Sequence, residues 1–346
     1  MSYLIINLDK GVIFISSNVN KRDKTHEIWA AKAMANRLIP HHPMKEKVMA
    51  DLKIKYAEII GEKEIEYTLS LLDQKKYLIM HNLRLKDGFK KYFQIDSLVL
   101  AKQFLLVVEV KNWKGKILFG TNGQVTRIGP DGSEEGYKNP IPQAKTQVLR
   151  LKRWLRNHNF PDIPIVYLVV ISFPQTIIER KNPQDTIPYE VIHNSDLIFR
   201  IEEIEKQFTK DFYTRNQLSE LAKHLDLSHC PRKINLFEKY NITPNDLVKG
   251  VFCPSCGALP MVRQERKWFC NACSHYSAHA HRPALADYIV FFGRTISNQG
   301  AREFLLLPSP NVTKMILQRE SEFQEGKTKG KKYKLKWNKD EIKKWL

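Results

Sequence analysis

The sequence has no long apolar run. A membrane-spanning helix needs about 20 consecutive apolar residues, and the longest candidate is the short stretch from Ile165 to Phe173. The N-terminus has no basic region, and polar residues interrupt its apolar ones around Asp9 and Lys10, which argues against a secretory signal peptide. We therefore expect a cytoplasmic protein with no membrane partner.

Acidic residues are scarce relative to basic ones. The 346 residues include 37 Asp and Glu against 56 Lys and Arg, which leaves a net charge of +19. Such a surplus favours a polyanionic partner, because lysines and arginines that neutralise phosphates release condensed counterions. Composition alone leaves an inert basic surface and an anionic membrane open as alternatives to nucleic acid.

Cysteine is also rare, but its spacing is informative. Four of the five cysteines form two Cys-x-x-Cys pairs, Cys253 with Cys256 and Cys270 with Cys273, separated by thirteen residues. In a reducing compartment such pairs indicate metal ligands rather than disulfides. Four thiolates suit tetrahedral Zn²⁺ and leave no open position. We expect a structural zinc in a zinc ribbon over residues 251–282.

The apolar patterns predict an α/β protein. At about 100–200 residues per domain, a chain of this length is expected to form two or three units. Helical spacing predicts helices over residues 45–73 and 141–157, and apolar runs predict strands at 77–85, 92–101, 104–111 and 165–173. We expect five segments: an N-terminal extension (1–40), an α/β domain (41–200), a helical linker (201–250), the zinc ribbon (251–282) and a basic module (283–346).

Two acids and a lysine stand out on the second and third expected strands. If these strands form a hairpin with a two-residue loop, counting outwards from the loop places Asp96 opposite Glu109 on one face. Lys111 lies two residues beyond Glu109 and therefore shares that face. A register slip of one residue would move Asp96 to the opposite face.

These three residue types suit a specific chemistry. Two opposed carboxylates repel each other unless a cation lies between them. Acids that hold Mg²⁺ or Mn²⁺, with a lysine that orients the nucleophile or stabilises developing charge, are what metal-assisted phosphodiester hydrolysis requires. A solvated ion pair on the sheet is the alternative that this triplet alone leaves open.

Four motifs, in order, resemble a known family. They are Gly61-Glu62-x-x-Ile65, Gln94-Ile95-Asp96, Glu109-Val110-Lys111-Asn112-Trp113-x-Gly115 and Asn139-Pro140-x-x-Gln143. Together they resemble the nuclease-related domain, NERD, a branch of the PD-(D/E)XK nuclease superfamily, over roughly residues 45–175. The resemblance implies a restriction-endonuclease-like α/β core, with a mixed sheet flanked by helices, and a metal-dependent DNA nuclease activity.

The resemblance also implies a role for individual residues. Asp96 and Glu109 would be the ligands of Mg²⁺ or Mn²⁺, and Lys111 would be the catalytic lysine. Glu62 would be an accessory acid from the first helix, and Gln143 a polar site residue at the start of the second. The first 40 residues match nothing in the family, and many relatives lack the C-terminal segments.

The lysine-rich C-terminal segment resembles a winged helix-turn-helix. Two helices are expected over residues 301–307 and 312–319, followed by a two-stranded wing between 325 and 337; such a module contacts DNA with its second helix and its wing. A solvated helical hairpin with a charged tail is the alternative. His275, His279 and His281 are expected at the surface or on phosphate. The expected nucleic-acid-binding residues are Lys314, Arg319, Lys327, Lys329, Lys331 and Lys332.

Three functions stay open on the sequence. The first is a metal-dependent nuclease that uses the ribbon and the wing to hold DNA. The second is a catalytically silent DNA- or RNA-binding or regulatory protein that retains the nuclease fold, and the third is a nuclease or binder acting on RNA. The intact acid and lysine set favours the first, because losing one acid is the simplest way to lose the metal. A homodimer also stays open, although no interface signature is present.

Overall fold

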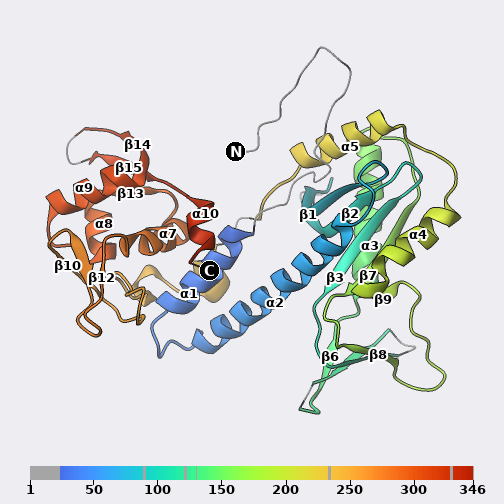
Figure 1. Ribbon diagram of the computed structural model, residues 1–346, viewed down its shortest axis with the longest axis horizontal. Helices are drawn as coiled ribbons and strands as arrows, with labels where there is room; N and C mark the ends of the chain where they lie inside the picture. Colours follow the sequence, from blue (N-terminus) through green and yellow to red (C-terminus); the bar gives the residue numbers. More distant parts are fainter. Residues whose placement is uncertain are drawn as a thin grey trace. The chain divides into compact units, whose positions relative to one another are not determined.

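The protein forms two compact units, which Figure 1 shows coloured along the chain. The computed structural model describes residues 24–88, 91–120, 123–129, 131–232, 235–327 and 330–345. Within these ranges, the first unit comprises residues 57–232, and the second comprises residues 24–56 together with 235–345. The five segments expected from the sequence were drawn from motifs rather than from packing, and they stay a prediction.

The first unit is built around a five-stranded mixed sheet. Its strands follow the order β1 (Leu78–Lys86), β2 (Tyr92–Leu100), β3 (Leu105–Lys111), β7 (Ile165–Ile171) and β9 (Val191–His193). The first three are antiparallel neighbours, whereas β3, β7 and β9 run parallel. Helices cover both faces of the central strands, which explains why β3 is an almost uninterrupted apolar run.

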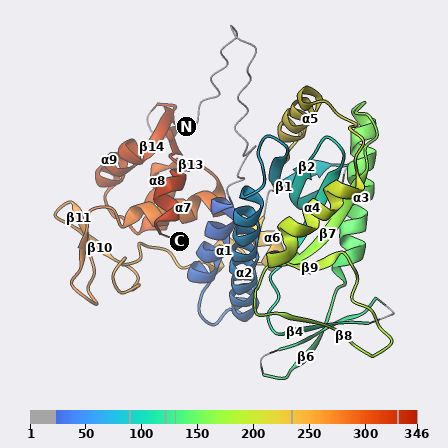
Figure 2. The same cartoon turned by 45° about the vertical axis from the view of Figure 1, so that its right-hand side comes forward.

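Each face of this sheet has its own core. Helices α3 (Pro140–Asn157) and α5 (Arg215–Leu227) supply Leu151 and Leu221 to one core, and α2 (Lys45–Ser70) and α4 (Leu197–Gln207) supply Ile65 and Ile201 to the other. Figure 2 shows α3 and α4 alongside the strands. The mixed α/β architecture expected from the apolar periodicity is therefore confirmed.

The hairpin between β2 and β3 has the register inferred from the sequence. Leu100 pairs with Leu105 and Ser97 with Val108, and the backbone N–H of Ala101 donates to the Phe104 carbonyl. By the same count Asp96 lies opposite Glu109, one step beyond the last of these pairs. Strand alternation puts both residues on the face covered by α3, because Leu98 and Leu105 pack in the core beneath that helix.

A smaller sheet follows the candidate site along the chain. It has the order β6 (Glu134–Tyr137), β5 (Val125–Ile128), β4 (Lys116–Phe119) and β8 (Ile177–Arg180). Gly115 begins it with φ of +95°, and a Cβ there would lie 2.2 Å from the Ile128 carbonyl oxygen. Only glycine fits this turn without moving the backbone, which accounts for the glycine at the end of the Glu-Val-Lys motif.

The second unit combines the cysteine-rich segment with a helical module. The second unit also contains the helices α1 (Thr25–Arg37), α6 (Leu236–Tyr240) and α10 (Lys339–Lys343) and the single-turn helix Pro244–Asp246. A similar single turn, Asn194–Asp196, belongs to the first unit. The cysteine-rich segment has three strands, β10 (Val262–Gln264), β11 (Lys267–Phe269) and β12 (Tyr276–Ser277). Of the expected extension, residues 1–23 lie outside the described residues, and α1 packs on α7 (His281–Phe292).

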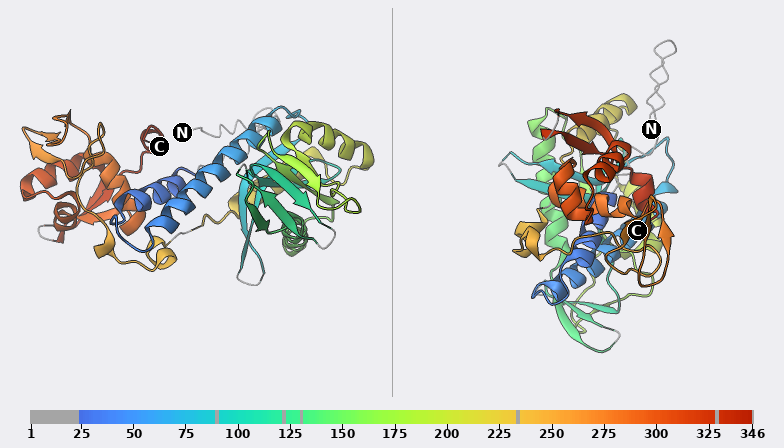
Figure 3. Two further views of the ribbon diagram at one scale, coloured as in Figure 1. Left: turned by 90° about the horizontal axis from the view of Figure 1, so that it is seen from below. Right: turned by 90° about the vertical axis from the view of Figure 1, so that its left-hand side faces the viewer.

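The remaining elements of the second unit form a three-stranded sheet with three helices. After α7 come β13 (Thr295–Ser297), α8 (Asn298–Leu305), α9 (Pro310–Glu320), β14 (Ser321–Glu325) and β15 (Lys332–Leu335), drawn in orange and red in Figure 3. The sheet order is β13-β15-β14, all antiparallel. Two helices followed by a strand pair are thus present in the expected order, but the first strand, β14, ends at Glu325, where the expected wing begins. Among the described residues, no helix has the length and apolar character needed to cross a membrane.

Candidate functional site

A buried carboxylate lies at the end of β3. Glu109 is only 1% exposed, and its Oε1 accepts hydrogen bonds of 2.6 Å from both Lys111 Nζ and Gln143 Nε2. Its other oxygen, Oε2, accepts a 2.6 Å bond from Gln147 Nε2. Burying an ionised carboxylate is costly unless donors surround it, so these three side chains are what allow Glu109 to lie inside the protein.

Helix α3 brings two amides to this carboxylate. The Asn139 side chain caps the helix by accepting from the Ile141 N–H at 2.9 Å, and Pro140 occupies the first turn, as expected for a helix start. Gln143 and Gln147 are four residues apart and therefore share one face of the helix. Lys111 Nζ also donates to Gln143 Oε1 at 3.3 Å, which closes a small polar ring around Glu109.

Asp96 lies on the neighbouring strand, where the β2–β3 ladder opens. The last paired residues of the ladder are Ser97 and Val108. One step further, Asp96 Oδ2 accepts a 2.9 Å hydrogen bond from the Val110 backbone N–H. The carboxylate thus takes the place of a strand carbonyl, which fixes it beside the residue between Glu109 and Lys111.

Glu62 approaches from α2 through an asparagine on β1. Its Oε2 accepts a 3.2 Å hydrogen bond from Asn82 Nδ2. Asn82 falls between the pairs His81 with Ser97 and Leu83 with Ile95, so it lies opposite Asp96. Its φ of +51° shifts the alternation of β1, and asparagine tolerates this left-handed conformation better than most residues. Asn82, Asp96 and Glu109 therefore form a row across three adjacent strands.

The close approach of α2 depends on Gly61. A Cβ at this position would lie 2.5 Å from Ser172 Oγ and 2.7 Å from Asn112 Cβ, so a larger residue would push the helix away from the strand ends. Asn112 also donates from Nδ2 to the Ala57 carbonyl at 2.6 Å. The Gly-Glu motif and the residue after Lys111 therefore act together to hold the helix that carries Glu62.

Residues 57–172 of the chain match the family model of the nuclease-related domain, NERD. The chain contains a nuclease-related domain. All five residues inferred for the catalytic site fall inside this match. A curated relative, an uncharacterized protein from Bacillus anthracis, is 26% identical over 185 residues, which is 52% of this chain and 84% of that protein. No solved structure matches the chain significantly.

The structure joins the expected residues of the NERD site to different extents. Glu109, Lys111 and Gln143 contact one another directly, whereas Asp96 reaches them through the Val110 backbone and Glu62 bonds to Asn82. The carboxylates of Glu62, Asp96 and Glu109 do not converge into a group of three ligands. Among the described residues, the cysteine cluster is the only place where three or more acids, histidines or cysteines have ligand atoms within 4.8 Å of one another.

Two polar residues of the candidate site were not inferred from the sequence. Gln147 is 5% exposed and bonds to Glu109, and no hydrogen-bond partner for its buried Oε1 is present among the described residues. Its position one helical turn after Gln143 was the available signal. Asn82 interrupts the apolar run of β1, and the spacing of Met80 and Leu83 around it was the corresponding signal.

The cysteine cluster of the second unit has the geometry of a zinc site. The Sγ atoms of Cys253, Cys256, Cys270 and Cys273 all lie within 4.8 Å of one another. Two of the separations are 3.7 Å, between Cys253 and Cys273, and 3.6 Å, between Cys256 and Cys270. Four thiolates about 2.3 Å from a tetrahedral Zn²⁺ lie about 3.8 Å apart. The cluster is therefore consistent with the structural zinc expected from the spacing.

The expectation that His281 lies at the surface was wrong. This side chain is buried, and its Nδ1 accepts a 3.0 Å hydrogen bond from Trp268 Nε1. Its Nε2 lies 3.4 Å from Glu320 Oε1, which Arg282 also contacts at 3.1 Å. Burial alone raises the pKa of the Glu320 carboxyl, but His281 and Arg282 outweigh burial and lower it to about 2. His281 thus joins the cysteine-rich segment to the end of α9.

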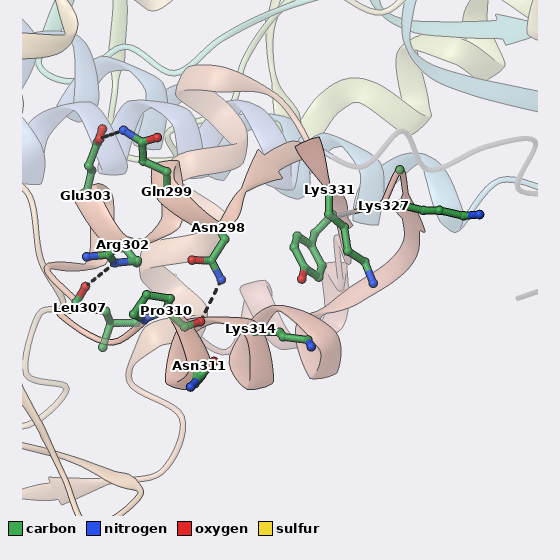
Figure 4. Close-up of a pocket in the computed structure, with 12 residues that line it drawn as sticks. Asn298, Gln299, Arg302, Glu303, Leu307, Pro310, Asn311, Lys314, Lys327 and Lys331 are labelled. Atoms are coloured by element: carbon green, nitrogen blue, oxygen red, sulfur yellow. Dashed lines mark hydrogen bonds between the residues drawn. The ribbon is translucent and has the colours of Figure 1, made fainter. Parts of the chain in front are cut away.

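A basic cleft lies between α8, α9 and the strand pair of the second unit. Its lining includes Asn298, Asn311, Lys314, Lys327 and Lys331, which Figure 4 draws as sticks. Lys331 also lies 5.6 Å from the centre of the Tyr333 ring. Arg319 and Lys332 are exposed but do not line the cleft, and Lys329 lies outside the described residues.

Proposed function

We propose that this protein is a metal-dependent nuclease of the PD-(D/E)XK type, which hydrolyses phosphodiester bonds of DNA. The observation that carries the proposal is the convergence of Lys111 and Gln143 on Glu109, with Asp96 held in register on the adjacent strand. A buried acid and a lysine that is 21% exposed, both near the end of the central strand β3, suit chemistry on a substrate that approaches from solvent.

The donor set fits a hard divalent cation. Asp96 and Glu109 would hold Mg²⁺ or Mn²⁺, which prefer carboxylate oxygens, and Glu62 would be the accessory acid. The fit is supported by the chemistry of the donors, since Asp96 and Glu109 offer carboxylate oxygens from adjacent strands, with Asp96 fixed by the Val110 backbone N–H. When bound, the cation polarises the phosphate and lowers the pKa of water.

The side chains of the site have separable tasks in such a reaction. Hydrolysis forms a bond between a water oxygen and phosphorus and breaks one ester bond, so negative charge grows on the phosphoryl oxygens. The Lys111 ammonium stabilises that charge or orients the attacking water. Gln143 and Gln147 orient Glu109, because each amide donates to a different carboxylate oxygen.

The second unit serves as the nucleic-acid-binding module of this nuclease. The element order from α7 to β15 and the antiparallel order β13-β15-β14 support a winged helix, with α9 as the recognition helix and the turn after β14 as the wing. The cluster of Lys314, Lys327 and Lys331 on one cleft supports phosphate contacts, which position a protein on DNA without reading its sequence.

One observation favours a catalytically silent binding protein instead. Both oxygens of Glu109 already accept hydrogen bonds from side chains, so a cation must displace at least one of these donors. A protein of this kind would bind DNA or RNA and retain the nuclease fold without turnover. The presence of both Asp96 and Lys111 supports the active form.

The proposal is tested by DNA cleavage in the presence of Mg²⁺ or Mn²⁺. The wild type is expected to cut supercoiled plasmid or linear duplex, and to stop when the cation is removed. Glu109→Gln keeps the shape of the side chain but removes its charge, so we expect cleavage to fall by at least about 100-fold. A parallel assay on RNA establishes which nucleic acid is the better substrate.

Glu58→Gln is the matched control, since it removes an exposed acid one turn before Glu62 on the same helix. This variant is expected to cut at the wild-type rate. Absence of cleavage of every nucleic-acid form, or equal cleavage by Glu109→Gln, would contradict the enzyme proposal and leave the silent binding protein.

The role of the second unit is tested by substituting its three clustered lysines. A triple variant is expected to weaken duplex binding about 10- to 100-fold near physiological salt. It combines Lys314→Ala, Lys327→Ala and Lys331→Ala. The slope of log affinity against log salt should fall by about 2 to 3, because each neutralised phosphate contributes about 0.9. Fluorescence anisotropy measures both quantities.

The control for this experiment removes the same charge elsewhere in the second unit. Lys47, Lys53 and Lys249 are exposed and do not line the cleft, so the corresponding triple alanine variant should retain most of the salt slope. Equal slopes for the two triple variants would show that the cleft has no special role in DNA binding.

A further inference from the structure

A second basic cavity lies in the first unit, away from Glu109. It has a volume of about 260 Å³, and Lys86, Arg150, Arg153 and Asn157 contribute to its lining. Three of these residues are cations, whereas the lining contains a single carboxylate, that of Asp87. The lining is therefore net positive, which suits an anion.

The lone acid of this cavity serves to position an arginine. Asp87 Oδ1 accepts a 3.0 Å hydrogen bond from the Lys91 backbone N–H, and its Oδ2 lies 3.9 Å from Arg150 Nε. Arg150 Nη1 in turn donates to the Tyr92 carbonyl at 3.2 Å. The guanidinium is thus held by two partners beside the cavity, and Lys86 and Arg153 supply further positive charge to the lining.

Helix α3 connects this cavity to the candidate catalytic site. Gln143, Arg150 and Asn157 follow one another at intervals of seven residues, so they lie along the same edge of the helix. At about 1.5 Å per residue, Arg150 lies about 10 Å and Asn157 about 21 Å further along the axis than Gln143. A polar track therefore runs from the residue that contacts Glu109 to the basic cavity.

We propose that this cavity binds a backbone phosphate of the same nucleic-acid strand that is cut at Glu109. Phosphates of one strand of duplex DNA rise about 3.4 Å per nucleotide along the helix axis, so an offset of about 10 Å corresponds to about three nucleotides from the cleaved bond. The preferred substrate is then a strand that continues past the site, rather than a short end. This inference rests on the proposed nuclease function and specifies the substrate it needs.

The phosphate contact acts on binding and leaves chemistry unchanged. Glu109 is held by Lys111 and by Gln143 and Gln147 from the first part of α3, whereas Lys86, Arg153 and Asn157 line the cavity. Removing these positive charges should therefore raise KM for long substrates while kcat stays within about twofold. Substrates that end within about two nucleotides of the cut cannot reach the cavity, so wild type and variant should have the same KM for them.

The test compares two double variants. The cavity variant combines Lys86→Ala with Arg153→Ala, and its matched control carries two substitutions on α3. Lys145→Ala with Lys152→Ala also removes two charges, and helical periodicity places both positions on the side of α3 opposite Gln143. We expect KM for a 30-nucleotide duplex to rise about tenfold in the cavity variant and less than threefold in the control. Lys86→Ala alone serves if the double variant does not fold.

A binding measurement separates this inference from the proposed catalysis. Fluorescence anisotropy of the same duplexes is recorded in the Glu109→Gln background, where no turnover is expected. Weaker binding of long but not short duplexes by the cavity variant supports the phosphate site even if the wild type proves inactive. Equal affinities of the cavity and control variants for long duplexes overturn it, whereas cleavage unaffected by Glu109→Gln overturns the proposed function alone.

Discussion

Loss of zinc is expected to unfold the part of the second unit from about residue 251 to residue 335. The cysteine-rich segment and the helices share one core, in which Cys253, Cys270 and Trp268 pack with Leu285, Leu317 and other buried residues. The short strands β10 to β12 offer little hydrogen bonding of their own. In small zinc-dependent domains the ion supplies about 10–16 kcal/mol of folding free energy, so its removal should collapse this shared core.

Zinc is removed by the substitution Cys270→Ser or by a chelator, and backbone hydrogen exchange then measures which elements unfold. Backbone protection is expected to fall across α7 to β15 and to persist in β1, β2, β3 and β7, since the cores beneath those strands contain no residue of the second unit. Elemental analysis should find about one zinc per chain in the wild type and less in Cys270→Ser.

Cys230→Ser is the matched control, because Cys230 is the cysteine outside the cluster. It should keep the zinc and the protection pattern. Full protection of α8 and α9 in a zinc-free protein would contradict the prediction and would show that the helices form an independent domain.

Lys111→Ala is expected to separate cation binding from catalysis. In the structure Lys111 Nζ donates a 2.6 Å hydrogen bond to Glu109 Oε1, so the ammonium competes with a cation for the carboxylate. Removing it should leave Mn²⁺ affinity unchanged or tighter. Cleavage should nevertheless fall by about 100- to 10,000-fold, because the ammonium that stabilises charge in the transition state is lost.

Calorimetric titration with Mn²⁺ and single-turnover cleavage measure the two effects. Glu109→Gln is the contrasting variant, since it should lose both cation binding and cleavage. Lys111→Arg keeps the positive charge on a longer and planar group, so partial activity is expected from it. If Lys111→Ala cuts at the wild-type rate, Lys111 is only a counterion for Glu109 and has no catalytic role.

The sequence contained much of the fold because its local signals agreed with one another. The segments β1, β2, β3 and β7 are rich enough in apolar and aromatic residues to indicate strands. The two-residue loop before Phe104 set the register that opposes Asp96 and Glu109. The cap at Asn139 likewise marked the start of α3. Each of these features depends on residues that are close in the chain.

The details of the site were harder to infer because they depend on contacts between distant elements. Gln147 bonds to Glu109 across 38 positions and Asn82 bonds to Glu62 across 20. Neither pairing follows from helical or strand spacing alone, since each requires a helix to pack on a particular part of the sheet. The burial of His281 has the same origin, as its partners Trp268 and Glu320 come from two other elements.

By itself, the sequence determined the strand register that opposes Asp96 and Glu109, the motifs of a nuclease-related domain and the spacing of four cysteines suited to zinc. Tertiary structure alone decided that Glu109 is saturated by three donors, that the cysteine-rich segment and the helical module share a core, and that α3 links Gln143 to a basic cavity. The physical reason is that backbone periodicity is local, whereas burial and charge compensation arise from packing between segments far apart in the chain.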